Sequence, residues 1–109
     1  MRRVATHRAY DLITSQWISF PVIELDENGC VCRIYSLTEE ISHTEWLPGM
    51  ILLSPCPVNK GVEEEFSMFI KRVTCMARIY ANTPKRAYWI SFFNLSDVDF
   101  TSSSRIVAL

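Results

Sequence analysis

Apolar and polar residues alternate on both sides of an Asn-Gly pair, and this pattern predicts a β-hairpin. Residues 22–27 read Val-Ile-Glu-Leu-Asp-Glu, Asn28 and Gly29 follow, and residues 30–35 read Cys-Val-Cys-Arg-Ile-Tyr. Asn-Gly between alternating segments is typical of a two-residue type I′ turn, because both residues tolerate a positive φ. We therefore expect Asn28 and Gly29 to be the central residues of the turn.

A two-residue turn also fixes which residues of the hairpin lie opposite each other. It places Glu24 opposite Arg33, so that unlike charges meet on one face, and it places Leu25 opposite Cys32. A slip of one residue would mix the two faces, which makes this register the expected one. The apolar face then consists of Ile23, Leu25, Cys30, Cys32 and Ile34.

Apolar residues recur at spacings of three and four over residues 59–82, and this spacing predicts an amphipathic helix. Asn59 is expected to cap its start, and Asn82 and Pro84 are expected to end it. Residues 63–65 are glutamates near the expected N-terminus, where the helix dipole favours negative charge. The apolar stripe is expected to be core that covers a sheet, and it comprises Val62, Phe66, Phe69, Ile70, Val73, Met76, Ala77 and Tyr80.

Shorter apolar segments predict the remaining strands. We expect strands at residues 3–10, 16–20, within 46–54 after a Pro-Gly turn, 87–95 and, at a sheet edge, 104–109, with an irregular loop over 37–45. The fold class is therefore mainly β with one long amphipathic helix (α+β), in a small β-sandwich or barrel-like sheet built from both ends of the chain. Residues 1–109 are expected to form a single domain, with N-terminal strands and hairpin over 1–57, the helix over 58–84 and C-terminal strands over 85–109.

The composition adds an excess of apolar area to this picture. The chain of 109 residues is 49% hydrophobic and contains three Trp, four Tyr and six Phe residues. A domain of this size buries only about 60–70% of its unfolded surface, and a net charge of −1 gives little repulsion between copies. We therefore expect a homodimer or larger homo-oligomer, with the strand around residues 88–93 or the exposed flank of the helix in the interface.

The distribution of charge excludes other classes of partner. Eleven Lys and Arg residues are balanced by twelve Asp and Glu residues along the whole chain, so we expect no nucleic-acid partner. The longest uncharged stretch, residues 46–59, contains three prolines, whereas a membrane span needs about 20 apolar residues. We expect no membrane partner, no signal peptide and a cytoplasmic location with reduced thiols.

Three segments resemble the small β domain of amidohydrolase-superfamily enzymes. Residues 20–34, FPVIELDENGCVCRI, and residues 46–54, WLPGMILLS, resemble the hairpin and Pro-Gly turn that lead to the first barrel strand of that family. Residues 94–107 resemble the C-terminal strands that complete the same composite domain. The resemblance implies a β domain built from both chain ends, with a complete amidohydrolase as a further candidate partner.

The catalytic parts of that family have no counterpart in this sequence. The family pattern Pro-Gly-x-x-Asp-x-His-x-His falls on Pro48, Gly49, Leu52, Ser54 and Cys56, so none of its metal-binding residues is carried over. Where the family has a catalytic barrel, this chain has one predicted helix. The resemblance therefore implies the auxiliary domain without its enzyme, and we expect no catalytic residues, cofactor or bound metal.

Cysteine and histidine supply the reactive side chains that remain. Cys30, Cys32 and Cys56 could bind a metal together with His43, but structural zinc ligands are usually spaced Cys-x₂₋₄-Cys on turns. A Cys-x-Cys pair inside a strand is more typical of an apolar core, and we expect all four cysteines, including Cys75, to be small core residues. His7 and His43 are the general-base candidates near neutral pH, and His43 lies in a loop rich in glutamate.

Asp97 and Asp99 alternate along the chain and could share a cation. A hard cation prefers six or more oxygen ligands, and no further oxygen cluster accompanies these two carboxylates in the sequence. The solvated face of a strand is the favoured interpretation.

Aromatic residues form the last candidate site. They could line an apolar pocket for a small molecule, or they could pack in the core or in an interface. The residues concerned are Trp46, Tyr88, Trp89, Phe92 and Phe93.

The sequence therefore leaves two hypotheses of function. The first is a non-catalytic, self-associating interaction domain that resembles the amidohydrolase β domain. The alternative is a small-ligand or metal-binding protein, as a vestigial hydrolase would be, with Cys30, Cys32, His43 and Cys56 as its reactive residues.

Overall fold

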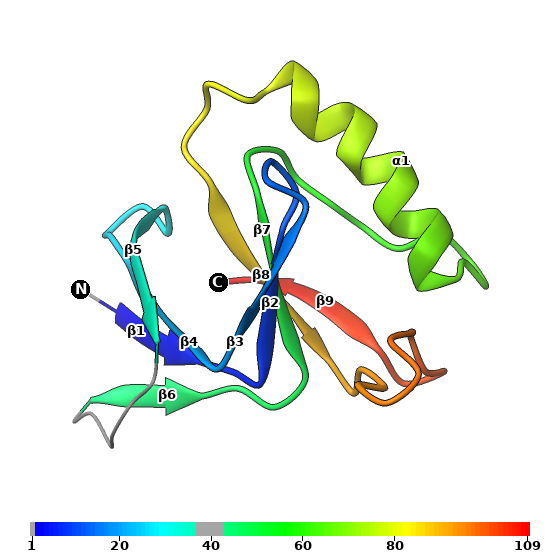
Figure 1. Cartoon of the computed structure of the whole chain (residues 1–109), viewed down its shortest axis with the longest axis horizontal. Helices are drawn as coiled ribbons and strands as arrows, with labels where there is room; N and C mark the ends of the chain where they lie inside the picture. The colour runs from blue at the N-terminus through cyan, green and yellow to red at the C-terminus, as the bar shows by residue number, and fades with distance from the viewer. Residues whose placement is uncertain (1, 37–42) are drawn as a thin grey trace.

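The computed structural model describes residues 2–36 and 43–109, and within these ranges the chain is mainly β with one helix (Figure 1). The elements are β1 (Arg2–Ala5), β2 (Arg8–Asp11), β3 (Gln16–Ser19), β4 (Pro21–Leu25), β5 (Val31–Ser36), β6 (Thr44–Trp46), β7 (Met50–Ser54), α1 (Phe66–Ile79), β8 (Arg86–Ser91) and β9 (Arg105–Ala108).

The strands form two mixed sheets. One has the order β5-β4-β1-β6 and the other has the order β3-β2-β7-β8-β9. Each sheet contains one parallel pair, β1 with β6 and β2 with β7. The chain passes from one sheet to the other three times, between β1 and β2, between β3 and β4, and between β6 and β7, and these connections converge at the lower centre of Figure 1.

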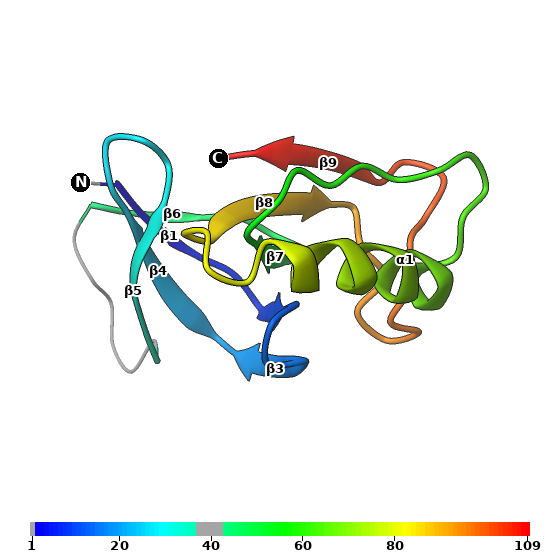
Figure 2. The same cartoon turned by 90° about the horizontal axis from the view of Figure 1, so that it is seen from above.

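Two apolar clusters lie on opposite faces of the five-stranded sheet. Successive side chains of β7 point to alternate faces, and all five of its residues are buried. Met50 and Leu52 belong to the cluster under α1, whereas Ile51 and Leu53 belong to the cluster shared with the four-stranded sheet. Figure 2 shows α1 running along the five-stranded sheet. The buried strand predicted within residues 46–54 is therefore confirmed.

The helix is shorter than the sequence pattern predicts. It begins at Phe66 rather than near Asn59, which does not cap it, and it ends at Ile79. The N-terminal cap comes from a distant segment, since the Phe66 backbone N–H donates to Asp99 Oδ1 at 2.8 Å. A carboxylate in this position satisfies a backbone donor that the helix leaves free.

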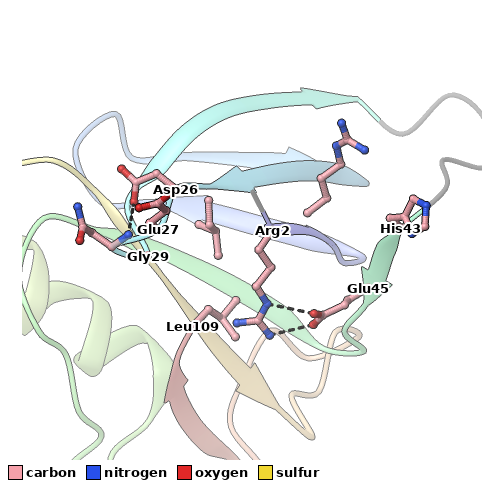
Figure 3. A pocket seen from close by; sticks show the side chains of 10 residues that line it. Arg2, Asp26, Glu27, Gly29, His43, Glu45 and Leu109 are labelled. Carbon is pink, nitrogen blue, oxygen red and sulfur yellow. Dashed lines mark hydrogen bonds and ion pairs between the residues drawn. The ribbon is translucent and has the colours of Figure 1, made fainter.

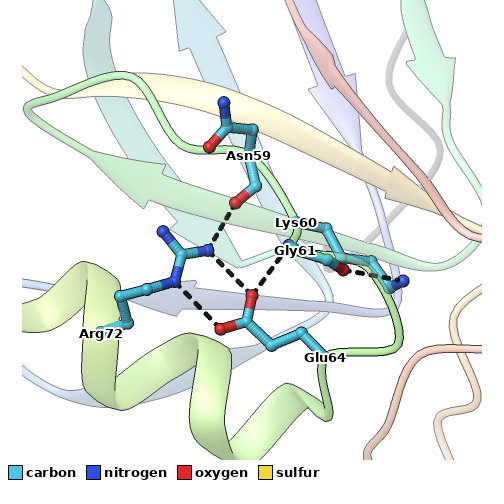
Figure 4. Close-up of polar contacts among 5 residues, drawn as sticks. All are labelled: Asn59, Lys60, Gly61, Glu64 and Arg72. Carbon is cyan, nitrogen blue, oxygen red and sulfur yellow. Dashed lines mark hydrogen bonds and ion pairs between the residues drawn. The ribbon is translucent and has the colours of Figure 1, made fainter.

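Residues 59–65 form a loop that is held to the helix by one ion pair (Figure 4). Arg72 donates from Nε and Nη2 to the two carboxylate oxygens of Glu64, at 3.0 and 2.8 Å, and Nη2 also donates to the Asn59 carbonyl oxygen at 2.6 Å. The Arg72 guanidinium and the Gly61 N–H lower the pKa of Glu64 to about 2. Glu64 therefore closes this loop instead of occupying the first helical turn.

Only part of the predicted apolar stripe of the helix is buried. Phe66, Phe69, Val73 and Ala77 face the sheet, as the three- and four-residue spacing predicts. Val62 lies outside the helix and is 96% exposed, and Met76 and Tyr80 are also exposed. The assignment of these three residues to the core was wrong, because Val62 and Tyr80 lie outside α1 and Met76 lies beside its buried face.

The hairpin forms with a different turn. The Gly29 N–H donates to the Asp26 carbonyl oxygen at 3.0 Å, so Glu27 and Asn28 are the central residues. Only Gly29 has a positive φ (+80°), so the predicted type I′ turn was wrong and the arrangement is a type I turn followed by a left-handed glycine.

The hairpin register is confirmed in its middle and shifted near the turn. Glu24 lies opposite Arg33 as expected, but Leu25 pairs with Val31 instead of Cys32 across an irregularity. As a consequence Cys32 is exposed rather than part of the apolar face, and Cys30 is only half-buried. A longer turn with one extra residue shifts the pairing in this way.

Substitution of Gly29 tests the turn directly. A Cβ at this position would lie 2.9 Å from the Leu109 carbonyl oxygen, and the φ of +80° disfavours any β-branched side chain. We expect Gly29→Val to lower the free energy of unfolding by about 2 kcal/mol, measured by urea denaturation. Asn28→Val is the matched control with an ordinary φ, and an equal loss in both variants would contradict the turn assignment.

Other element boundaries differ in detail. The predicted strand over residues 3–10 is two strands, because the chain changes sheets between Ala5 and Arg8. In the predicted loop over 37–45, residues 37–42 lie outside the described part, and Thr44–Trp46 form β6. The predicted strand 87–95 ends at Ser91, whereas the short edge strand near the C-terminus is confirmed as β9.

Candidate functional site

The structure separates the five aromatic residues that the sequence grouped together. Tyr88 and Phe93 are buried in the cluster beneath α1. Trp89 points to the opposite face of the sheet and is half-buried, whereas Trp46 and Phe92 are exposed. The burial of Tyr88 raises the pKa of its hydroxyl. Tyr88 therefore does not contribute to a surface site.

Exposed aromatic side chains gather instead around His7, at the corner where the chain crosses between the sheets. The His7 ring contacts Trp46 edge-to-face, with ring centroids 4.8 Å apart, and it contacts Phe20 with centroids 6.0 Å apart. The Phe20 backbone N–H donates to the His7 carbonyl oxygen at 2.8 Å, which ties two of the crossings together. We call Phe20, His7, Trp46, Trp89 and Phe92 the aromatic corner.

A hollow of about 400 Å³ opens within this corner. Its volume falls in the range of small-molecule sites, which are mostly lined by apolar and aromatic groups with a few polar ones. None of the described residues that line it is an Asp, Glu, Lys or Arg. The lining residues are His7, Pro48, Gly49, Trp89, Ser91, Phe92, Phe93 and Leu95.

The Pro48–Gly49 turn forms a fixed wall of the hollow. Gly49 has a φ of +109°, and a Cβ there would lie 2.5 Å from the Ile90 carbonyl oxygen, so only glycine allows the turn to lie against β8. The Gly49 carbonyl oxygen accepts a hydrogen bond from Thr6 Oγ1 at 3.1 Å. Trp89 Nε1 donates to the Pro48 carbonyl oxygen at 2.8 Å, which fixes the indole ring.

Phe92 forms the rim of the hollow and is held in an unusual backbone conformation. Its φ is +52° and it is 70% exposed. Its carbonyl oxygen accepts hydrogen bonds from Thr101 Oγ1 at 2.7 Å and from Ser104 Oγ at 3.0 Å. A bulky residue stays in this region of φ only when its surroundings hold it there. The fold thus holds the backbone of an exposed phenylalanine in one conformation.

A second hollow, of about 640 Å³, is polar and lies beside the hairpin turn (Figure 3). Arg2 and Glu45 face each other in it through two hydrogen bonds of 3.1 and 2.8 Å. This contact raises the pKa of Arg2 and lowers that of Glu45. His43 also lines this hollow. Because the Arg2 guanidinium already has a carboxylate partner here, we regard the aromatic corner as the better candidate.

The cysteines do not assemble into a site in the part of the chain that the structure describes. Cys56 is buried, whereas Cys30 and Cys32 lie in the hairpin on the other sheet. Across residues 2–36 and 43–109, no three His, Cys, Asp or Glu side chains are placed to hold a metal ion. The expectation that all the cysteines are core residues was wrong for Cys32 and Cys75, which are exposed.

The positions that match the family's metal-binding pattern are all in the interior. Leu52, Ser54 and Cys56 are buried, and Ser54 Oγ donates to the Cys56 carbonyl oxygen at 2.7 Å. Ser54 therefore stabilises the chain where it leaves β7.

The side chains of Asp97 and Asp99 accept hydrogen bonds from other residues of the chain and do not form the solvated face of a strand. Asp97 Oδ2 accepts a hydrogen bond from Asn94 Nδ2 at 3.0 Å, within a turn. Asp99 caps α1, as described above. The interpretation of these residues as the solvated face of a strand was wrong, because residues 95–98 form turns.

Comparisons with known proteins returned no match to a family model, to a curated protein or to a solved structure. No helix in the described part of the chain has the length and apolar character required to cross a bilayer.

Sequence reasoning missed Phe20 and the role of His7. Pro21 is a signal in the sequence that could have indicated Phe20, because proline is typical of the start of a strand. Phe20 therefore lies between the end of one strand and the start of the next. Nothing local to His7 indicates that a change of sheet occurs there.

Proposed function

We propose that this protein is a non-catalytic interaction domain that self-associates through the outward face of α1. The observation that carries the proposal is that α1 is apolar on two opposite sides. One side packs on the five-stranded sheet. The other carries exposed residues at i, i+7, i+8 and i+11, which share one side of a helix. We call these residues the outward stripe: Met68, Cys75, Met76 and Ile79.

The exposure of the outward stripe is large for residues of this kind. Ile79 is 79% exposed and Met68 is 56% exposed. A surface helix normally presents charged or polar residues on the side away from the core. Arg72 lies on the same side, but its guanidinium is held at the N-terminal loop by Glu64 (Figure 4), so it does not interrupt the stripe with a free charge.

A second copy of the chain fits this surface better than it fits the strand around residues 88–93. β8 lies between β7 and β9 and therefore offers no free edge. Methionine side chains adapt to irregular surfaces and are common in interfaces. The surroundings of His7, which are the aromatic rings of Trp46 and Phe20, support a non-catalytic role.

We also propose three further properties that the sequence predicts. The two sheets share one apolar cluster, which supports the finer description of the fold as a small β-sandwich. A complete amidohydrolase as partner, and a cytoplasmic location, rest on the sequence patterns alone.

The proposal is tested by the mass of the protein in solution. We expect light scattering at micromolar concentration to give twice the 12.6 kDa of the chain. Met68→Glu should return it to a monomer, because a carboxylate in an apolar interface is costly to desolvate. Ser67→Glu is the matched control, since it adds the same charge one residue earlier, on a different side of the first turn.

Two outcomes would reject this function. A mass of 12.6 kDa for the unmodified chain at all micromolar concentrations would exclude self-association. A dimer that persists in Met68→Glu would show that another surface forms the interface.

A further inference from the structure

The hollow within the aromatic corner combines features that a binding site for a small molecule requires, and none of its lining residues belongs to the outward stripe. Its hollow of about 400 Å³ is larger than the roughly 150 Å³ that suffices for benzene. A compound with one ring or with two fused rings would therefore fill a substantial part of the hollow.

The walls of the hollow are fixed before any ligand arrives. Trp89 is held by its hydrogen bond to Pro48, and the Gly49 backbone is held by Thr6 and by its approach to Ile90. A site that does not need to order its side chains loses less entropy when a ligand binds. Phe92 supplies a second ring at the rim, and its backbone is anchored by two hydroxyl groups.

The polar groups of the hollow narrow the chemistry of the ligand. His7 and Ser91 are the polar side chains in a lining without carboxylates, ammonium groups or guanidinium groups among the described residues. An ionised group on the ligand would lose its water here without gaining an opposite charge, which is unfavourable. An uncharged ring with one N–H or O–H group would keep a hydrogen-bond partner in His7 or Ser91.

We propose that the hollow between His7, Trp89 and Phe92 binds a small, uncharged aromatic or heteroaromatic compound. Its ring lies against the Trp89 and Phe92 rings, and its polar group faces His7 or Ser91. Offset or edge-to-face contacts between aromatic rings add to the burial of apolar area. This binding goes beyond the self-association proposed above and does not depend on it.

Indole is the probe, because it is uncharged, has two fused rings and carries one N–H group. We expect indole to shift the NMR signal of the Trp89 Nε1–H and to bind with a dissociation constant of roughly 10 µM to 1 mM, as its few atoms allow. Indole-3-carboxylate, which carries a charge, should bind at least fivefold more weakly. An absence of saturable shifts with indole, or tighter binding of the carboxylate, would overturn the proposal.

Two glycine substitutions separate the hollow from the rest of the aromatic corner. Phe92→Gly removes the rim ring and relieves its positive φ, so the protein should stay folded while indole binding weakens at least tenfold. Phe20→Gly is closely matched, since Phe20 is also an exposed phenylalanine with a positive φ (+46°), but it does not line the hollow. Indole binding should change less than twofold in Phe20→Gly.

Equal binding of indole by Phe92→Gly and by the unmodified chain would show that the hollow is not the site. An equal loss in both variants would show general adsorption to exposed aromatic side chains. Either result would overturn the proposal. Light scattering of the same two variants reports self-association independently, because neither substitution lies in the outward stripe.

Discussion

Substitution of Gly49 by alanine is expected to destabilise the protein by about 3 kcal/mol or more. Two costs add at this position. The φ of +109° is disfavoured for any residue with a Cβ, and the new atom would lie 2.5 Å from the Ile90 carbonyl oxygen. The backbone of β8 cannot retreat easily, because it is paired on both sides by β7 and β9. Thermal unfolding should show a melting temperature lowered by roughly 12 °C.

Gly61→Ala is the matched control for Gly49→Ala. Gly61 has no positive φ, and a Cβ there would meet only the flexible side chain of Glu64, at 3.3 Å. Its substitution should change the free energy of unfolding by less than about 0.5 kcal/mol. Similar melting temperatures for the two variants would show that the turn is not packed against β8 as described.

Truncation of Phe69 to alanine is the second large effect that we expect, at about 3–5 kcal/mol. Phe69 is completely buried in the N-terminal half of α1. Its ring lies edge-to-face with Phe100 at 5.2 Å between centroids and stacks with Phe66 at 6.1 Å. Loss of this ring leaves a cavity and removes the contacts that hold the helix and the C-terminal loop together. The midpoint of urea denaturation measures the loss.

Met68→Ala provides the comparison for Phe69→Ala on the neighbouring residue. Met68 faces solvent, so its truncation should cost less than about 0.5 kcal/mol in a monomer at low concentration. A small effect of Phe69→Ala would contradict the packing of α1 on the five-stranded sheet.

Local patterns predicted the elements whose structure depends on neighbours in sequence. The alternation around Asn28 and Gly29 gave the hairpin, and the spacing of Phe66, Phe69 and Val73 gave the buried face of the helix. The exact turn escaped prediction because an Asn-Gly pair is compatible with more than one arrangement. Only the position of Asp26, whose carbonyl and carboxylate accept the turn's hydrogen bonds, distinguishes them.

Features that depend on distant segments could not be predicted in this way. The N-terminus of α1 is set by Asp99, which lies 33 residues further along the chain. The aromatic corner forms because the connections between the sheets near His7, Phe20 and Pro48 lie close together in space. No repeat or spacing in the sequence predicts that these connections are neighbours. The prediction grouped Trp46 with the aromatic residues of one predicted strand, although alternation along β8 sends Tyr88 and Trp89 to opposite faces.

The resemblance to the amidohydrolase β domain is still a prediction. It anticipated strands from both ends of the chain and a Pro-Gly turn before a buried strand, which the structure contains. These features are common to many β domains, and no compared protein supports a relationship.

The three crossings between the sheets also bear on how the chain folds. Parallel pairing joins Arg3 to Thr44 and Arg8 to Met50, so each sheet contains one pairing that can form only after a long loop has closed. Closing such long loops lowers the conformational entropy of the chain before the contacts between paired strands can stabilise it. We therefore expect folding in the slow range of roughly milliseconds to seconds. Both sheets contribute residues to one buried apolar cluster. We therefore expect loss of either sheet to expose apolar residues of the other, so that the two sheets unfold together.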